Sequence, residues 1–211
     1  MTASHCTTDS FFRTRRTLLA TAIAAVPFAL AGCGSKASDQ PLAFEAGNDI
    51  TGTHLGSDLD MTDTAGRHRT LADFKGKVLL VYFGYTQCPD VCPTSMAMAA
   101  QAMQLLGAKA HDVQVVMITV DPARDTPKIL SAYVQTFDPA FMGLTGSEEQ
   151  LARTARSFKA SYSKDPGPTP QQYAMNHSSA FYLLDRTGNA RALISANTTP
   201  QAMAHDIQLL L

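Results

Sequence analysis

The fold of this chain is decided by residues 81–93, which read Val81-Tyr82-Phe83-Gly84-Tyr85-Thr86-Gln87-Cys88-Pro89-Asp90-Val91-Cys92-Pro93. The stretch continues an apolar run that begins at Val78, and such a run predicts a central strand buried on both faces. Cys88 and Cys92 follow in a tight turn, and Pro93 opens the next helix, because proline is favoured in a first helical turn. Paired thiols at a strand-to-helix turn indicate redox chemistry, soft-metal binding or a structural disulfide.

The segments on either side of this stretch predict an α/β domain. Helices are expected at 93–107, 126–137, 147–160 and 199–211, and strands at 78–83, 113–120, 141–144, 179–184 and 190–194. Residues 44–61 predict short strands or a hairpin, whereas the proline-bearing segment 161–176 fits no regular element. This order predicts a thioredoxin-like fold: a mixed central sheet with flanking helices and an N-terminal β extension, with the reactive cysteines at the first strand-to-helix turn.

The amino-acid composition limits the classes of protein to which this chain can belong. The 211 residues carry a net charge of −1, and 45% of them are hydrophobic. These values fit one globular domain plus an extra segment. The charges are mixed and form no basic run, so no nucleic-acid partner is expected.

The first residues of the chain predict export. Arg13, Arg15 and Arg16 precede an apolar, small-residue-rich run over 18–31. This run is short for a spanning helix and typical of a signal peptide, which we place at residues 1–32. Arg15-Arg16 also resembles a twin-arginine export signal. A short membrane anchor or a buried helix is the alternative interpretation.

The apolar run ends in Leu30-Ala31-Gly32-Cys33, which resembles a bacterial lipobox. By that resemblance Cys33 becomes the lipidated N-terminus of the mature protein. Residues 33–41 are then a small, polar tether, and the domain occupies residues 42–211. We therefore expect an exported protein on the periplasmic side, lipid-anchored to a bacterial membrane through Cys33.

Cys88 and Cys92 are the thiols left for chemistry once Cys6 is removed and Cys33 is lipidated. In an oxidising compartment, two nearby thiols tend toward a disulfide unless they are reduced or metallated. A helix N-terminus is expected to lower their pKa and favour thiolate. Their three-residue spacing differs from the two-residue spacing of common thiol–disulfide oxidoreductases, and it closes too small a loop for an effective structural staple.

Three motifs together resemble the Sco/SenC family of copper-binding assembly proteins. The first is the run over 84–94, which contains both cysteines of the turn. The second is Asp121-Pro122-Ala123-Arg124-Asp125-Thr126-Pro127, and the third is Asn176-His177-Ser178. The motifs occur in order with suitable separations, and the similarity covers roughly residues 42–211.

This resemblance implies a thioredoxin-like fold in which Cys88, Cys92 and His177 bind copper as Cu(I) or Cu(II). Members of the family deliver copper to the binuclear copper centre of cytochrome c oxidase, or reduce the cysteines of that centre. The implied partner is the copper-centre subunit of the oxidase or another copper chaperone. Family members often have a transmembrane anchor, in place of which this chain is expected to use Cys33.

The three side chains also make chemical sense as copper ligands. Thiolate sulfur suits Cu(I), and imidazole helps to accommodate Cu(II). Zinc accepts the same ligands but usually takes a fourth in a structural site. The position of His177 at the start of a strand beside the reactive turn favours a ligand over an ordinary solvated histidine.

A second function is a thiol–disulfide oxidoreductase that acts on exported partner proteins, with Cys88 and Cys92 as its redox-active pair. Such an enzyme does not need His177, and it usually carries a proline where this chain reads Asn176-His177-Ser178. A peroxidase is less favoured. The peroxiredoxin-type pattern has a proline seven positions before the cysteine, and this chain has Val81 there. The sequence thus predicts mainly a metallochaperone and leaves thiol–disulfide reductase activity open.

Neighbouring polar and sulfur-containing residues have a structural interpretation. Asp121, Arg124 and Asp125 are expected to brace the site rather than bind metal, because arginine is not a copper ligand. The methionines of the helix at 93–107 are expected in packing. Asp90, between the cysteines, is expected to be a solvated turn residue.

Overall fold

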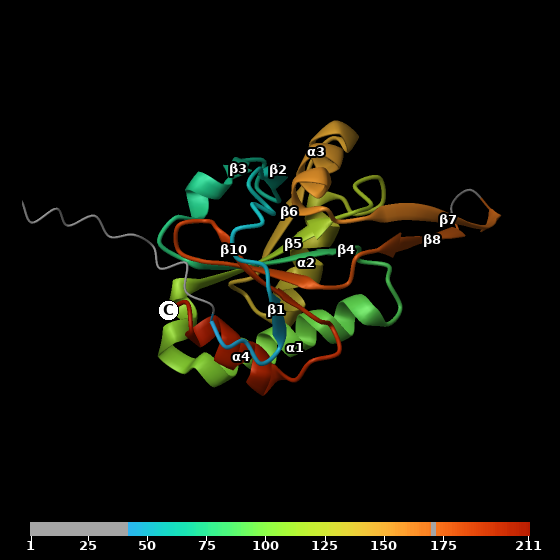
Figure 1. The fold of residues 1–211 in the computed structure, drawn as a ribbon. Coiled ribbons are helices and arrows are strands. Elements are labelled where there is room, and N and C mark those ends of the chain that lie inside the picture. Colours follow the sequence, from blue (N-terminus) through green and yellow to red (C-terminus); the bar gives the residue numbers. More distant parts are fainter. Residues whose placement is uncertain (1–41, 170–171) are drawn as a thin grey trace, which may run out of the picture. The chain divides into compact units, whose positions relative to one another are not determined.

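The computed structural model describes residues 42–169 and 172–211 (Figure 1). The strands are β1 Gly47–Asp49, β2 Asp60–Asp63, β3 His68–Thr70, β4 Val78–Gly84, β5 Val113–Thr119, β6 Met142–Thr145, β7 Tyr162–Thr169, β8 Gln172–His177, β9 Phe181–Leu184 and β10 Ala190–Ile194. The helices are η1 Leu71–Phe74, α1 Val91–Leu106, η2 Gly107–Asp112, α2 Pro127–Phe137, α3 Glu148–Phe158 and α4 Pro200–Gln208.

An eight-stranded mixed sheet forms the centre of the domain, with strand order β1-β10-β9-β4-β5-β6-β2-β3. β4 pairs in parallel with β5 and antiparallel with β9, which makes the sheet mixed, as predicted. All seven residues of β4 are buried, because helices cover both faces of the strand. Figure 1 shows α1 and α4 on one side of the sheet and α3 on the other. The structure therefore confirms the predicted α/β, thioredoxin-like architecture.

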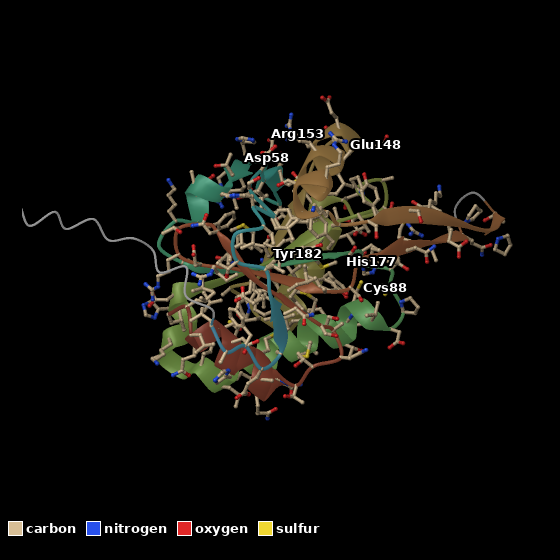
Figure 2. All side chains as sticks on the ribbon, in the orientation of Figure 1. Asp58, Cys88, Glu148, Arg153, His177 and Tyr182 are labelled. Carbon is tan, nitrogen blue, oxygen red and sulfur yellow. The ribbon has the colours of Figure 1, made fainter. Side chains whose placement is uncertain are left out.

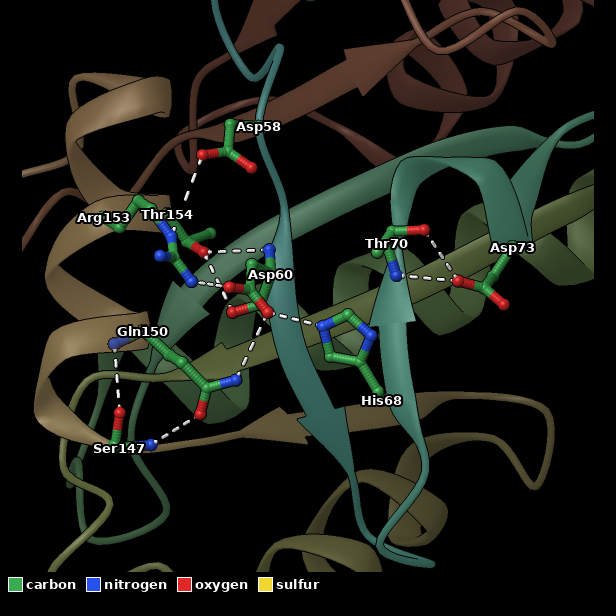
Figure 3. A network of polar contacts seen from close by, with 9 residues as sticks. All are labelled: Asp58, Asp60, His68, Thr70, Asp73, Ser147, Gln150, Arg153 and Thr154. Atoms are coloured by element: carbon green, nitrogen blue, oxygen red, sulfur yellow. Dashed lines mark hydrogen bonds and ion pairs between the residues drawn. The ribbon is translucent and has the colours of Figure 1, made fainter.

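A polar network fastens α3 to the β2–β3 edge of the sheet (Figure 3). Asp60 of β2 forms an ion pair with Arg153 of α3, and it accepts a hydrogen bond from Gln150 Nε2 at 3.3 Å. His68 Nε2 lies 2.5 Å from Asp60 Oδ1. Ser147 caps α3 and exchanges hydrogen bonds with Gln150, so the helix begins with a capping box.

Residues 161–176 differ from the sequence-based expectation. They hold β7 and most of β8, which pair antiparallel as a separate two-stranded sheet with Tyr162 opposite His177. Pro166 and Pro168 are compatible with β7 because a strand at an edge can lack backbone N–H donors. The prolines therefore indicate an edge strand, not the absence of a strand.

The N-terminal β extension is present, but residues 44–61 do not form a hairpin of their own. β1 pairs with β10, and β2 pairs with β3 and β6, so both strands join the main sheet through distant partners. Within residues 42–169 and 172–211, no helix has the length and apolar character needed to cross a membrane. The signal peptide (1–32), Cys33 and the tether (33–41) lie outside the described residues and stay predictions.

Candidate metal centre

The two thiols lie where β4 leads into α1. The helix begins at Val91, two residues earlier than predicted, so Cys92 lies within its first turn. Pro93 is accommodated there because the first N–H groups of a helix have no intrahelical acceptor. Cys92 is buried and Cys88 is partly exposed. The backbone N–H of Cys92 donates to Cys88 Sγ at 3.4 Å, which holds the Cys88 sulfur against the first turn of α1.

Burial governs the protonation of the inner thiol. Desolvation raises the pKa of Cys92 to about 12, and the nearby Cys88 adds to this effect, while a backbone hydrogen bond at Tyr85 opposes it. The expectation that the helix N-terminus would favour thiolate is therefore wrong for Cys92. Removing the thiolate from water destabilises it more than the N-terminus of the helix stabilises it.

His177, the last residue of β8, supplies the third side chain. Its Nε2 lies 3.3 Å from Cys92 Sγ, and its Nδ1 lies 3.0 Å from the carbonyl oxygen of Ser178. A carbonyl can only accept, so Nδ1 carries the proton and Nε2 keeps its lone pair for a ligand. The rings of Tyr82 and Tyr85 meet the imidazole edge-on, with centroids 6.0 and 5.8 Å away, and fix its orientation.

The ligand atoms of Cys88, Cys92 and His177 all lie within 4.8 Å of one another. Figure 2 shows Cys88 and His177 together beside the start of α1. Metal–sulfur and metal–nitrogen bonds are about 2.0–2.3 Å long, so three ligands around one ion lie roughly 4 Å apart. Two sulfurs and one imidazole at this spacing fit a soft or borderline metal ion such as copper.

Asp125 anchors the loop that carries the cysteines. Its buried carboxylate accepts hydrogen bonds from Thr86 N at 3.0 Å and Thr86 Oγ1 at 2.6 Å. It also accepts a hydrogen bond from Thr119 Oγ1 at 2.6 Å. Thr86 is two residues before Cys88, so these contacts tie the thiol loop to the end of β5.

Arg124 connects the thiol loop with the hairpin that carries the histidine. It forms an ion pair with Asp121 and donates to Gln87 Oε1 at 3.1 Å and to the carbonyl oxygen of Tyr173 at 2.9 Å. Its guanidinium also stacks on the Tyr173 ring, 3.6 Å from the centroid. Tyr173 completes the group by donating to Asp121 Oδ1 at 2.8 Å. The expected brace therefore has two parts: Asp125 holds the thiol loop, and Arg124 joins that loop to the hairpin.

Tyr173 and Tyr82 are the residues of this region that sequence reasoning missed. Tyr82 reads as a core residue of a buried strand, and Tyr173 lies in the segment for which no regular element was expected. No sequence signal distinguishes either tyrosine, because the contacts that matter join distant parts of the chain. The α1 methionines are buried in the core, as expected, at Met96, Met98 and Met103.

The other histidines of the described region lie away from the thiols. His68 pairs with Asp60, and His111 pairs with Asp112. His205 lies beside the buried Asp206. Asp90 is exposed at the N-terminus of α1 and makes no side-chain capping bond, which agrees with a solvated turn residue.

Comparison with known proteins places this geometry in a family. Residues 48–211 match the family model described as SCO1/SenC. The mitochondrial SCO2 homolog of Bos taurus is 44% identical over 133 residues, which are 62% of this chain and 50% of that protein. An SCO2-like protein of Rickettsia felis is 36% identical over 151 residues, which are 71% of this chain and 74% of that protein. The match thus spans about half the length of the bovine relative.

Solved structures agree with this result. Bradyrhizobium japonicum ScoI, solved with copper bound, superposes with a TM-score of 0.69 at 36% identity, covering 74% of this chain and 99% of that one. A SCO1/SenC family lipoprotein from Bacillus anthracis gives a TM-score of 0.64 at 27% identity, covering 80% of this chain and 99% of that one. Because the family match covers most of the sequence, the chain belongs to the SCO1/SenC family.

Proposed function

We propose that this protein is an exported, membrane-tethered copper-binding protein that serves the binuclear copper centre of cytochrome c oxidase. It delivers copper to that centre or prepares the thiols of the centre to receive copper. The observation that carries the proposal is the convergence of Cys88, Cys92 and His177 within 4.8 Å. The copper-bound structure of a relative that is 36% identical supports copper as the metal.

The different exposure of the two sulfurs suggests how the metal leaves. Cys88 is partly exposed, whereas Cys92 has 0% of its surface exposed. A partner's ligand can therefore reach the metal from the side of Cys88 and His177, and Cys92 is the last ligand to be released. The partner is the copper-centre subunit of the oxidase or another copper chaperone.

Attachment to a membrane belongs to the same proposal. It rests on the Leu30-Ala31-Gly32-Cys33 lipobox and is supported by a relative described as a SCO1/SenC family lipoprotein. Residues 1–32 are then the signal peptide and residues 33–41 the tether. Radiolabelled palmitate supplied to expressing bacteria tests this point: label should enter the wild-type chain and be absent from Cys33→Ser.

The copper site is tested by adding Cu(II) to the reduced full chain carrying Cys6→Ser and Cys33→Ser. A thiolate-to-copper charge-transfer band is expected, because both remaining thiols are then metal ligands. The band should be lost in Cys88→Ser or Cys92→Ser and weakened in His177→Ala. His111→Ala is the matched control, since His111 pairs with Asp112 away from the thiols. A His177→Ala spectrum identical to that of the control would exclude His177 as a ligand.

Thiol–disulfide reduction is the second candidate, favoured by the approach of Cys88 and Cys92 to one another. In a reductase, the attacking thiol has to ionise near ambient pH. The raised pKa of Cys92 leaves the partly exposed Cys88 as the thiol that would attack a partner disulfide. Full reductase activity in His177→Ala, together with absence of the copper band in the parent chain, would favour this function over copper binding.

A further inference from the structure

Tyr82 contacts the inner sulfur of the site from within the core. The residue lies in β4 with 0% of its surface exposed, and its hydroxyl donates to Cys92 Sγ at 3.8 Å. A buried tyrosine hydroxyl needs a polar partner. Cys92 Sγ is the acceptor of its O–H, and the Ser95 side chain is a second polar neighbour of the hydroxyl.

Gly84 provides the space for this contact. It lies on the same face of β4 as Tyr82, two residues further along the strand. A Cβ at position 84 would lie 2.8 Å from the Tyr82 ring and 3.0 Å from Cys92 Sγ. Any larger residue would therefore push the ring and the sulfur away from their present positions.

The directions of the hydrogen bonds follow from the surrounding groups. His177 Nε2 has a free lone pair 3.3 Å from Cys92 Sγ, because its Nδ1 proton is directed to the Ser178 carbonyl. The thiol proton of Cys92 therefore points to His177, and the sulfur accepts from Tyr82. When a metal ion replaces the thiol proton, the sulfur becomes a thiolate, and a hydrogen bond to a charged acceptor is shorter and stronger.

We propose that Tyr82 is a positioning residue of the copper site, which holds Cys92 Sγ and reduces its electron donation to the metal through an O–H···S hydrogen bond. This inference rests on the proposed copper-binding function. Partners of metal ligands typically change metal affinity by 10–100-fold when they are removed. The Tyr82 ring also meets the His177 ring edge-on, so one side chain contacts two of the three ligands.

The test compares Tyr82→Phe with Tyr182→Phe in the reduced full chain that carries Cys6→Ser and Cys33→Ser. Tyr182 is a matched control, because it is a buried tyrosine of the adjacent strand β9 that packs on the other face against Phe83 and Phe158. In Tyr82→Phe, the charge-transfer band with Cu(II) should move to longer wavelength. The copper reduction potential should fall, because affinity for Cu(I) should drop about tenfold relative to affinity for Cu(II). The band of Tyr182→Phe should stay in place.

A band that is unchanged in Tyr82→Phe would overturn the role of Tyr82 and leave the copper site intact. Absence of any band in the parent chain would overturn both proposals. If Tyr82→Phe does not fold, a second measurement tests the same hydrogen bond. Fluorotyrosine incorporated throughout the parent chain makes each phenol a stronger donor and should move the band to shorter wavelength, also in Tyr182→Phe. A band that does not move on labelling would contradict the hydrogen bond.

Discussion

At the scale of the residue, the protonation of Cys92 controls when the site can take up metal. The side chain is in the first turn of α1, where a thiol is usually acidified, yet burial raises its pKa to about 12. The metal-free site therefore holds a neutral thiol at Cys92. This arrangement avoids an unpaired buried charge, which would otherwise destabilise the fold.

A pH dependence of copper uptake follows. Binding must displace the proton of Cys92, so affinity should rise at least tenfold per pH unit between about pH 6 and 8. Competition against a chelator of known pH dependence measures this slope, and proton release can be followed in weak buffer. An affinity independent of pH would show that Cys92 is already ionised or does not bind the metal.

The Cys92 thiol also makes the stability of the metal-free protein depend on pH. This stability falls as pH rises, whereas copper affinity rises. The folded pKa of about 12 lies above the ordinary thiol value of 9.0, so the folded state holds the Cys92 proton more tightly. The resulting contribution to stability is complete below pH 9 and is lost as pH rises toward 12. Urea unfolding at pH 8 and pH 10.5 should show a larger loss for the parent chain than for Cys92→Ala.

At the scale of the element, the site depends on the placement of the β7–β8 hairpin against the thiol loop. Its two strands pair with each other and form a sheet separate from the main one. Arg124 supplies a connection by contacting both Gln87 and Tyr173. We infer that the position of His177 depends on this contact, since β8 carries both Tyr173 and His177.

Arg124→Ala should therefore loosen the hairpin and weaken Cu(II) binding about tenfold, as expected for a residue that orients a ligand. Backbone amides of 172–177 should exchange with solvent faster in this variant. Arg124→Lys should rescue only in part, because an ammonium keeps the charge but loses the planar set of donors. Arg153→Ala is the control, since Arg153 pairs with Asp60 at the β2–β3 edge. Equal amide exchange in the Arg124 and Arg153 variants would argue against the brace.

At the scale of the whole molecule, Asp206 joins the two ends of the described region. This residue of α4 is fully buried, and its carboxylate accepts backbone hydrogen bonds from Glu45, Ala46 and Gly47 at 2.7, 2.9 and 2.8 Å. The contact fixes the segment that leads into β1.

Asp206→Ala should lower the free energy of unfolding by about 3 kcal/mol, because three backbone donors lose a charged acceptor. Amides of 45–47 should lose protection from hydrogen exchange, while the copper band keeps its wavelength. Asp49→Ala is a control in the same segment, because its exposed carboxylate accepts hydrogen bonds from the nearby Thr51. A copper band that shifts in Asp206→Ala would show that the terminal segment and the site are coupled.

The sequence by itself determined the order of the elements outside the β7–β8 hairpin, the thiol turn and the capping of α3. These features depend on residues close together in the chain, such as Ser147 and Gln150, whose spacing alone predicts their exchange of hydrogen bonds. His177 was identified through the resemblance of a short motif and its expected place beside the reactive turn, but it ends strand β8 and does not begin a strand as expected.

Only the tertiary structure decided how these parts meet. It placed Cys92 so deep that burial outweighs the helix end, and it formed a hairpin from a proline-bearing segment. It also brought Tyr82 to the inner sulfur and Arg124 to Tyr173. Burial from solvent and these contacts depend on residues far apart in the sequence. No local sequence pattern can therefore predict them.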